Sequence, residues 1–331
     1  MTDLSFIIPS YNSEKTLARA VSSITQQGLA SYEVLIIDDG SSDDTLKIAH
    51  KLAEDFNEVK VFTAGKGVSQ ARNVGLKNAT GKWVTFLDAD DFYLSDTLKT
   101  ALKIADQNNA QLQLFSFEHG LDPVVLKTSS TETLSIQCEM LEQPTKFLTV
   151  WAKFFLREHL VSQNILFNEE LTMSEDSEFV IRYAAACQSI AVSELILYHY
   201  SIDTPSATRS FDGEKLKNYL KSLEVVEKFI KTQPKALQDS FLKYVLIQVN
   251  LIAVRSIYAK NNPAPAPTKK AQLETVLDYP VVKDALDKLS LKDCLAPRFL
   301  PGAFLKLNLK PLAVTLFKLR TKQNQRKEKK A

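Results

Sequence analysis

The chain has 331 residues, of which 45% are hydrophobic and 24% are charged, and its formal net charge is +2. This composition is typical of a soluble globular protein, and it excludes a fibrous repeat or a chain that is disordered throughout. A length of this size predicts about two domains.

Cysteine usage and the N-terminus bear on the cellular compartment. Cys138, Cys187 and Cys294 lie far apart and form no CxxC spacing, so neither a disulfide framework nor a zinc site is predicted. The opening residues, MTDLSFIIPSYN, lack the basic start of a signal peptide. No apolar run reaches the roughly 18 residues of a membrane span. We therefore expect a cytoplasmic location.

The first hundred residues alternate between short β-rich runs and helical patterns. Strands are predicted over Leu4–Pro9, Tyr32–Asp38, Val59–Thr63 and Lys82–Asp88. Helices are predicted over Ser13–Gln27, Asp43–Phe56 and Val68–Asn78. This alternation predicts an α/β fold with a mostly parallel, Rossmann-like sheet that is flanked by helices on both faces. Ligands bind such sheets beyond the carboxyl ends of the strands.

The later part of the chain becomes increasingly helical. Its predicted elements are a helix over Ser95–Gln107, a strand over Gln111–Glu118, helices over Lys146–His159 and Asp176–Cys187, a strand over Leu195–Ser201, and a long helix over Lys235–Tyr258. The predicted domains are 1–211, with halves of about 1–118 and 119–211, a helical domain over 212–297, and a basic tail over 298–331.

Acidic residues gather where the fourth predicted strand ends. The apolar run WVTFL is followed by Asp88, Asp90 and Asp91. A solvated turn explains one such acid more easily than three. Oxygen ligands suit Mn²⁺ or Mg²⁺, which is often held by one or two carboxylates together with substrate phosphates. The pattern therefore favours a metal site that receives a nucleotide diphosphate.

Three further motifs fall at the same predicted edge or near it. The stretch DDGSSDDT places Asp38 and Asp39 at the end of the second strand, where a carboxylate can accept a base N–H or a ribose hydroxyl. Arg72, in GVSQARNVG, lies near the start of a helix, where its planar fork suits a phosphate or a base edge. The stretch MSEDSEF supplies Glu175 and Asp176. A helix capped at Ser174 explains these two acids, and so does a general base.

Together these pieces resemble the family 2 glycosyltransferases with the GT-A fold. The resemblance is carried by FIIPSYN, LIIDDGSSDDT, GVSQARNVG, WVTFLDADD and SEDSEF, in this order over roughly the first 180 residues, and it fades in the helical C-terminal third. It implies an inverting transferase that uses a nucleotide sugar, in most members a UDP-sugar. By the same resemblance, Pro9, Tyr11 and Asp39 would hold the uridine, and Arg72 would help to bind the nucleotide.

The resemblance also assigns roles to the acidic motifs. Asp88 would face the ribose or the donor sugar, Asp90 would bind Mn²⁺ or Mg²⁺, and Asp91 would lie near the donor sugar or the waters of the metal. Asp176 would be the catalytic base, with Glu175 as its neighbour or substitute.

The remaining implied residues lie towards the acceptor. Trp151 and Lys153 match a W-x-K element near the acceptor side, and Ser206 and Arg209 match a segment that closes over the diphosphate. The chain lacks the Q-x-x-R-W motif of processive synthases, which predicts addition of a single sugar. A saccharide, a lipid-linked molecule or a protein would each serve as acceptor, in the synthesis of a cell-surface polysaccharide, glycolipid or glycoprotein.

The basic tail has two interpretations. Residues 298–331 contain ten Lys or Arg and one acid, a local charge of +9 that leaves −7 for residues 1–297, and Pro311 is predicted to interrupt any long helix. The tail is either a solvated, partly disordered end or an attachment to the anionic inner face of the cell membrane. Nucleic acid is not expected, because no aromatic platform accompanies the charges.

A second hypothesis for the whole chain is a non-catalytic GT-A scaffold for another glycosyltransferase, with the helical third as its partner surface in a homo- or hetero-oligomer. The intact acidic residues argue against it, because a scaffold has no chemical need for them. A sugar-1-phosphate nucleotidyltransferase is disfavoured, because its glycine-rich N-terminal loop is absent.

Overall fold

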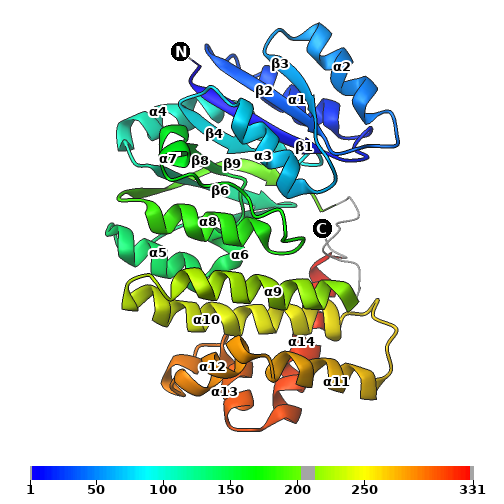
Figure 1. Ribbon diagram of the computed structural model, residues 1–331, viewed down its shortest axis with the longest axis vertical. Coiled ribbons are helices and arrows are strands. Elements are labelled where there is room, and N and C mark those ends of the chain that lie inside the picture. The colour runs from blue at the N-terminus through cyan, green and yellow to red at the C-terminus, as the bar shows by residue number, and fades with distance from the viewer. Residues whose placement is uncertain (1, 203–212, 329–331) are drawn as a thin grey trace. The chain divides into compact units, whose positions relative to one another are not determined.

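The computed structural model describes residues 2–202 and 213–328. The chain divides into two compact units, Met1–Ile136 with Thr145–Thr204, and Gln137–Pro144 with Pro205–Ala331. Every strand among the described residues lies in the first unit, and the second is built from helices (Figure 1). The predicted domain boundary between residues 211 and 212 lies outside the described residues.

The first unit is built around one sheet. Its strands are β1 (Leu4–Ser10), β2 (Tyr32–Asp38), β3 (Val59–Thr63), β4 (Trp83–Phe86), β5 (Phe92–Tyr93), β6 (Leu112–His119), β7 (Asp122–Val124), β8 (Lys153–Leu156) and β9 (Ile190–Tyr200). They are hydrogen-bonded in the order β3-β2-β1-β4-β8-β6-β9-β5, and β7 pairs with β6. The part β3-β2-β1-β4 is parallel, as predicted, whereas β8, β5 and β7 run antiparallel to their neighbours.

Helices cover this sheet. They are α1 (Leu17–Thr25), α2 (Thr45–Asp55), α3 (Val68–Asn78), α4 (Leu98–Asn108), α7 (Arg157–Ser162) and α8 (Glu175–Ala186). Two further helices, α5 (Thr133–Glu142) and α6 (Pro144–Phe147), lie where the chain passes between the units. The predicted α/β fold with flanking helices is confirmed, and β1 and β2 are buried almost throughout because such sheets are covered on both faces.

Glycine determines how closely α3 approaches the sheet. A Cβ atom on Gly75 would lie only 2.4 Å from Cγ2 of Ile7 in β1, so a larger residue would push the helix outward. Because α3 also carries Arg72, this close approach keeps the arginine beside the carboxyl edge of the sheet.

The helix predicted over Lys146–His159 is wrong. This stretch forms the end of α6, the strand β8 and the start of α7. Strand β8 pairs antiparallel with both β4 and β6, and Phe154 and Phe155 are fully buried on opposite faces of the sheet. A central strand buried on both faces shows no alternation of polar and apolar residues, so its sequence resembles a buried helix.

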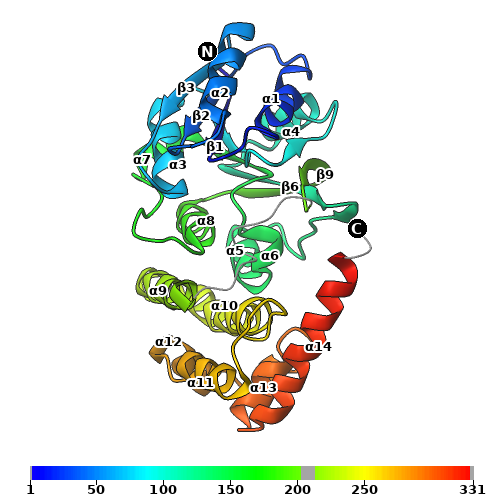
Figure 2. The same ribbon diagram turned by 90° about the vertical axis from the view of Figure 1, so that its right-hand side faces the viewer.

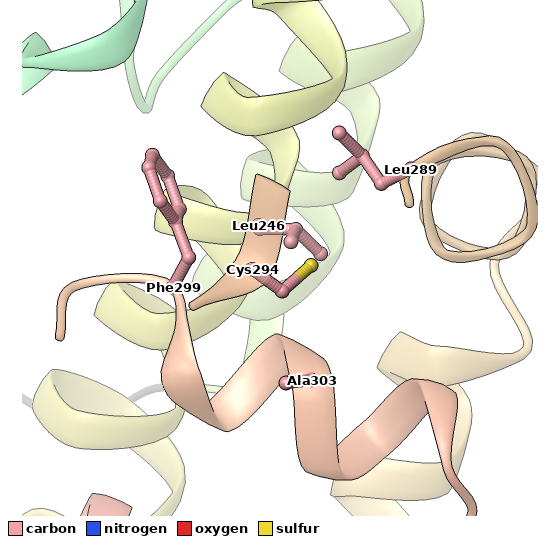
Figure 3. Packing of buried hydrophobic residues seen from close by; sticks show 5 residues of the cluster. All are labelled: Leu246, Leu289, Cys294, Phe299 and Ala303. Carbon is pink, nitrogen blue, oxygen red and sulfur yellow. The ribbon is translucent and has the colours of Figure 1, made fainter. Parts of the chain in front are cut away.

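The second unit is helical, as predicted for the C-terminal region. Its elements are α9 (Gly213–Ile230), α10 (Lys235–Ile252), the π-helical turn η2 (Ala253–Ile257), α11 (Ala266–Leu277), α12 (Pro280–Lys288), the 3₁₀ turn η3 (Lys292–Cys294), α13 (Leu300–Lys306) and α14 (Lys310–Glu328). One core cluster joins α10 to the segments that follow α12, and Figure 3 shows its five buried residues: Leu246, Leu289, Cys294, Phe299 and Ala303.

Most of the described part of the predicted tail is helical, in α13 and α14. The prediction that no long helix runs through Pro311 is confirmed, since α13 ends at Lys306 and α14 begins at Lys310, although α14 then continues for 19 residues. Proline fits there because the first helical turn needs no backbone N–H donor. Helix α14 packs through Ala313 and Phe317, which are both fully buried, and the chain turns back between α13 and α14 (Figure 2).

Within the described residues, one helical stretch, Lys235–Ile257, is long and apolar enough to cross a membrane. Its apolar window is 72% buried inside the protein, as expected for a core helix.

Candidate functional site

The carboxyl ends of three neighbouring strands form the floor of the candidate site. Ser10 of β1 pairs with Asp38 of β2, and Ile7 of β1 pairs with Phe86 of β4. The polar residues that follow these strands therefore meet at one edge of the sheet. Pro9 is half-buried within β1, whereas Tyr11, two residues later, exposes 59% of its surface.

The two acids after β2 have different surroundings. The Asp38 carboxylate is buried and accepts the backbone N–H groups of Gly40 and Ser41, both at 3.2 Å, so it shapes the turn. The Asp39 carboxylate accepts the N–H of Gly67 at 2.8 and 2.9 Å, which ties the end of β2 to the start of α3. Partial burial raises the pKa of Asp39.

Arg72 joins two of the predicted motifs. Its Nη2 lies 3.3 Å from Asp88 Oδ1, and its Nη1 lies 2.6 Å from Asp176 Oδ1 and 3.3 Å from Glu175 Oε1. The guanidinium also lies over the ring of Phe167, 5.3 Å from its centroid. Only 4% of the Arg72 side chain is exposed, against 28% for Asp88 and 27% for Asp176. The carboxylates therefore reach solvent, and the arginine that holds them does not.

The charges of this cluster do not balance, because Asp88, Glu175 and Asp176 share one guanidinium. Burial, together with the neighbouring Glu175, raises the pKa of Asp176 to about 7, although Arg72 opposes the rise. Burial likewise raises the pKa of Asp88 to about 6. Burial lowers the pKa of the nearby Lys153 to about 7, although Asp176 opposes the change. A proton can therefore enter or leave this cluster near neutral pH.

Trp151 and Lys153 lie beneath the site. Lys153 is 1% exposed, and its Nζ donates to Thr149 Oγ1 at 3.1 Å and to the carbonyl oxygen of Trp151 at 3.2 Å. The Trp151 ring is 6% exposed and stacks on Tyr198, with centroids 4.8 Å apart. Neither side chain presents a broad surface to a ligand.

Asp91 is turned into the protein. Its Oδ2 accepts the hydroxyl of Tyr198 at 2.6 Å, and its Oδ1 accepts the N–H of Ser201 at 2.7 Å. The same Tyr198 hydroxyl accepts the backbone N–H of Asp88 at 3.3 Å. Burial raises the pKa of Asp91 to about 8, although its two hydrogen bonds favour the charged form. Asp91 thus fixes the end of β9 and, through Tyr198, the backbone of Asp88.

Replacing Asp91 with alanine is expected to destabilise the protein. It leaves the Tyr198 hydroxyl and the Ser201 N–H without their acceptor, at a cost of about 1–3 kcal/mol for each buried group. Urea unfolding measures the loss, and Asp91→Asn, which keeps one acceptor oxygen, should lose less. Unchanged stability with weakened donor binding would support contact between Asp91 and the donor sugar instead.

The fit of a metal ion rests on Asp90 and Asp88. Arg19 donates to the backbone carbonyl of Asp90 and, at 3.3 Å, to Ser201 Oγ, which fixes the turn that carries both acids. Within residues 2–202 and 213–328, no group of three or more His, Cys, Asp or Glu side chains is arranged to hold a metal ion. Two carboxylates fit a cation that takes its other ligands from water and substrate phosphates.

Some residues that support the site were not predicted, and two predicted ones lie outside the described residues. Arg19, Phe167 and Tyr198 support the site from distant parts of the chain, and the sequence singled out none of them as a site residue. Ser174 makes no side-chain cap, since it precedes α8 in a left-handed conformation with φ of 59°. The predicted roles of Ser206 and Arg209 lie outside the described residues.

Residues 5–165 match the family described as glycosyl transferase family 2. The poly(ribitol-phosphate) beta-N-acetylglucosaminyltransferase TarS of Staphylococcus aureus is 30% identical over 212 residues, which cover 61% of this chain and 36% of TarS. The uncharacterized glycosyltransferase EpsJ of Bacillus subtilis is 28% identical over 215 residues, which cover 62% of each chain. This chain therefore matches only part of the length of these relatives.

Solved structures show the same fold. Residues 1–349 of TarS, in complex with UDP-GlcNAc, give a TM-score of 0.71 at 19% identity, covering 96% of this chain and 92% of that one. The mannosyltransferase PcManGT from Pyrobaculum calidifontis, in complex with GDP-Man and Mn²⁺, gives 0.53 at 15% identity, covering 96% and 86%. Residues 5–165 therefore belong to glycosyl transferase family 2, and the solved structures show that the chain has the GT-A fold.

Proposed function

We propose that this protein is an inverting glycosyltransferase that moves one sugar from a UDP-sugar to an acceptor hydroxyl in the synthesis of a cell-surface polymer. The buried cluster in which Arg72 joins Asp88 to Asp176 carries the proposal. It unites a carboxylate that would meet the donor with a carboxylate that can take a proton from the acceptor. The names of the relatives support the substrate class, since TarS acts on poly(ribitol phosphate).

Asp176 is the proposed general base. A base works best when its pKa lies near the working pH, and burial raises the pKa of Asp176 to about 7. About a quarter of its side chain is open to solvent, which leaves room for an acceptor hydroxyl. Glu175, on the same nitrogen of Arg72, would keep the guanidinium in place once Asp176 becomes neutral.

The reaction is a single displacement. The acceptor oxygen forms a bond to the anomeric carbon while its proton passes to a carboxylate oxygen of Asp176. The bond from the anomeric carbon to the diphosphate oxygen breaks on the opposite face, and its electron pair leaves with UDP. Attack and departure on opposite faces invert the configuration at the anomeric carbon.

The donor would occupy the edge formed by the ends of β1, β2 and β4. Pro9, Tyr11 and Asp39 are proposed to hold the uridine, and the TarS complex with UDP-GlcNAc supports this choice of nucleotide. Because Trp151 and Lys153 are buried, we propose that they act through Tyr198 and Asp176 and not by direct contact with the acceptor.

Asp90 is proposed to hold Mn²⁺ or Mg²⁺, with Asp88 beside it. The donor set suits such an ion, and the Mn²⁺ in the PcManGT complex supports the assignment. When bound, the ion would stabilise negative charge on the departing diphosphate. Cys138, Cys187 and Cys294 form no disulfide, which supports a reducing cytoplasm as the place of action.

The proposal is tested with a panel of UDP-, GDP- and CDP-sugars, Mn²⁺ and an extract of cell-surface glycans. We expect UDP release from one UDP-sugar. We expect EDTA to abolish this release and added Mn²⁺ to restore it. The Asp90→Asn variant should require more Mn²⁺ for half-maximal rate, because it removes one charged ligand.

The scaffold hypothesis predicts a different outcome of the same assay. A scaffold would bind UDP but would cleave no UDP-sugar, even with the extract present. The Asp90→Asn substitution would then affect only the binding of UDP. Release of GDP or CDP in place of UDP would support transferase activity but would show that the donor is not a UDP-sugar.

A further inference from the structure

The second unit exposes an unusual number of leucines in one short stretch. Among the described residues, eleven large hydrophobic side chains are exposed, and six of them fall between residues 291 and 319. The strongest concentration follows α13, where Leu307, Leu309 and Leu312 expose 51%, 43% and 47% of their surfaces. We call these three residues and Leu319 the leucine face. Four exposed leucines within 13 residues suit a surface for interaction with a partner or a membrane.

The leucine face is not the side on which α14 packs into its own unit. Ala313, Phe317 and Thr321 repeat every four residues along the inner side, where Ala313 and Phe317 are fully buried and Thr321 Oγ1 donates to the carbonyl oxygen of Val254 at 3.3 Å. Leu312 and Leu319 are seven residues apart and therefore share a different side of the helix. Leu319 is 49% exposed.

The turn before α14 brings further leucines to this region. Phe299, which immediately precedes α13, and Ala303 within α13 belong to the core cluster in Figure 3. After α13 ends, Asn308 adopts a left-handed conformation with φ of 57°, which reverses the chain into α14. Leu307 and Leu309 flank that residue and remain exposed at the corner.

The charge of the same segment is strongly positive. Residues 298–324 contain six Lys or Arg and no Asp or Glu. Lys318 and Lys322 are exposed on α14 beside Leu319. Lys306 donates only to the backbone carbonyls of Leu286 and Asp287, which leave its charge intact, whereas Lys310 pairs with Glu274. An occupant of this surface should therefore be anionic.

We propose that the leucine face and the lysines beside it dock onto a lipid bilayer that carries anionic headgroups. A bilayer offers both components that this surface matches, acyl chains for the leucines and negative charge for the lysines. Nucleic acid matches the charge alone, since leucines provide no platform for stacking bases. Docking would hold the transferase at the membrane where a lipid-linked acceptor is reached.

The test is sedimentation of the whole chain with vesicles, in the absence of donor and acceptor. Vesicles of phosphatidylcholine with a quarter phosphatidylglycerol should pull the protein down, pure phosphatidylcholine should not, and added salt should weaken the binding. Because no sugar is transferred in this assay, its result is independent of whether the proposed function is right.

Matched variants separate the two components. Lys318→Gln with Lys322→Gln should weaken binding about 25-fold, since each charge contributes about fivefold, or about 1 kcal/mol. The control, Lys47→Gln with Lys51→Gln, removes two exposed lysines with the same spacing from α2 and should change nothing. Leu309→Ser with Leu312→Ser should weaken binding at least as strongly, whereas Val161→Ser, at an exposed site elsewhere, should not.

Other occupants give other results. If the protein forms a dimer that the leucine variant abolishes while vesicles leave it in solution, a second copy covers the face and the membrane proposal is wrong. Equal binding by the leucine variant and its control also overturns the proposal. Circular dichroism and thermal unfolding of each variant verify that the fold is retained, which the exposed positions of these side chains favour.

Discussion

Replacing Asp176 with asparagine is expected to lower kcat by about 10²- to 10⁴-fold, because the acceptor hydroxyl loses the group that takes its proton. Binding of UDP should change little, since Asp88 and Glu175 remain to hold Arg72. Initial rates at saturating donor, together with UDP binding by calorimetry, measure both quantities. Transfer that persists in this variant while Asp90→Ala abolishes it would refute the choice of base.

The same variant should alter the dependence on pH. In the native protein the rate is expected to rise with pH through about 7, because Asp176 acts only after losing its proton and its pKa is raised to about 7. The residual rate of the asparagine variant should lack this rise. A rate profile between pH 5.5 and 8.5, with donor saturating at each pH, tests the assignment without relying on the loss of activity alone.

The stability of the Asp176→Asn variant shows whether its loss of activity is caused by unfolding. The pKa of Asp176 is higher in the folded protein than its ordinary value of about 3.9, so the folded state binds more protons than the unfolded state between these values. The free energy of unfolding contributed by this group is therefore greatest below pH 4 and falls as pH rises through 7. The asparagine of the Asp176→Asn variant carries no charge that burial could destabilise, and we expect this variant to be at least as stable as the native protein at pH 8.

The sequence was sufficient to predict that the main site residues lie close together, because the carboxyl ends of parallel strands meet at one edge of the sheet. The apolar runs before Pro9, Asp38 and Asp88 predicted three strands with the same direction, and β1, β2 and β4 are indeed neighbours. Arg72 followed from its place near the start of a helix after the third strand. These inferences depend on patterns within a few residues, which a single sequence displays.

The division of labour among the acids depends on contacts that the sequence does not display. Asp88, Asp90 and Asp91 fall within four residues and are chemically alike, yet Asp91 is 1% exposed and hydrogen-bonded to Tyr198. Because Tyr198 lies 107 residues away in the sequence, no local pattern reveals this contact. Strand β8 was missed for a related reason, since it is recognised by its neighbours β4 and β6 and not by its own pattern. Contacts between residues far apart in the sequence thus determined the surroundings of Asp91 and the identity of β8, which local periodicity could not predict.

Replacing Arg72 with methionine is expected to destabilise the first unit by about 3–5 kcal/mol, the cost of removing one partner from a buried ionic cluster. Methionine keeps much of the length of the side chain but leaves Asp88, Glu175 and Asp176 without a shared cation. Urea unfolding followed by tryptophan fluorescence measures the loss in this unit, because Trp83 and Trp151 both lie within it.

Two comparisons make this prediction specific to the cluster. Lys82→Met removes an exposed pair with Asp106 and should cost only about 0–1 kcal/mol. Arg72→Lys keeps a positive charge but has no planar fork to reach carboxylates on both sides, so it should recover only part of the loss. If Arg72→Met unfolded at the same urea concentration as the native protein yet lost affinity for UDP, the arginine would serve the nucleotide and not the acids.

Combining Arg72→Met with Asp176→Asn tests whether the two residues act as one unit. Residues in direct contact show coupling of about 0.5–3 kcal/mol in such double variants. Here the second substitution removes one of the carboxylates that the first leaves unbalanced, so the double variant should be more stable than Arg72→Met alone. Because the neutral asparagine side chain cannot act as a base, this recovery of stability should bring no recovery of transfer. Stability and catalysis would then make opposite demands on the same carboxylate, which is expected of a charge that is buried for its chemistry and not for its contribution to folding.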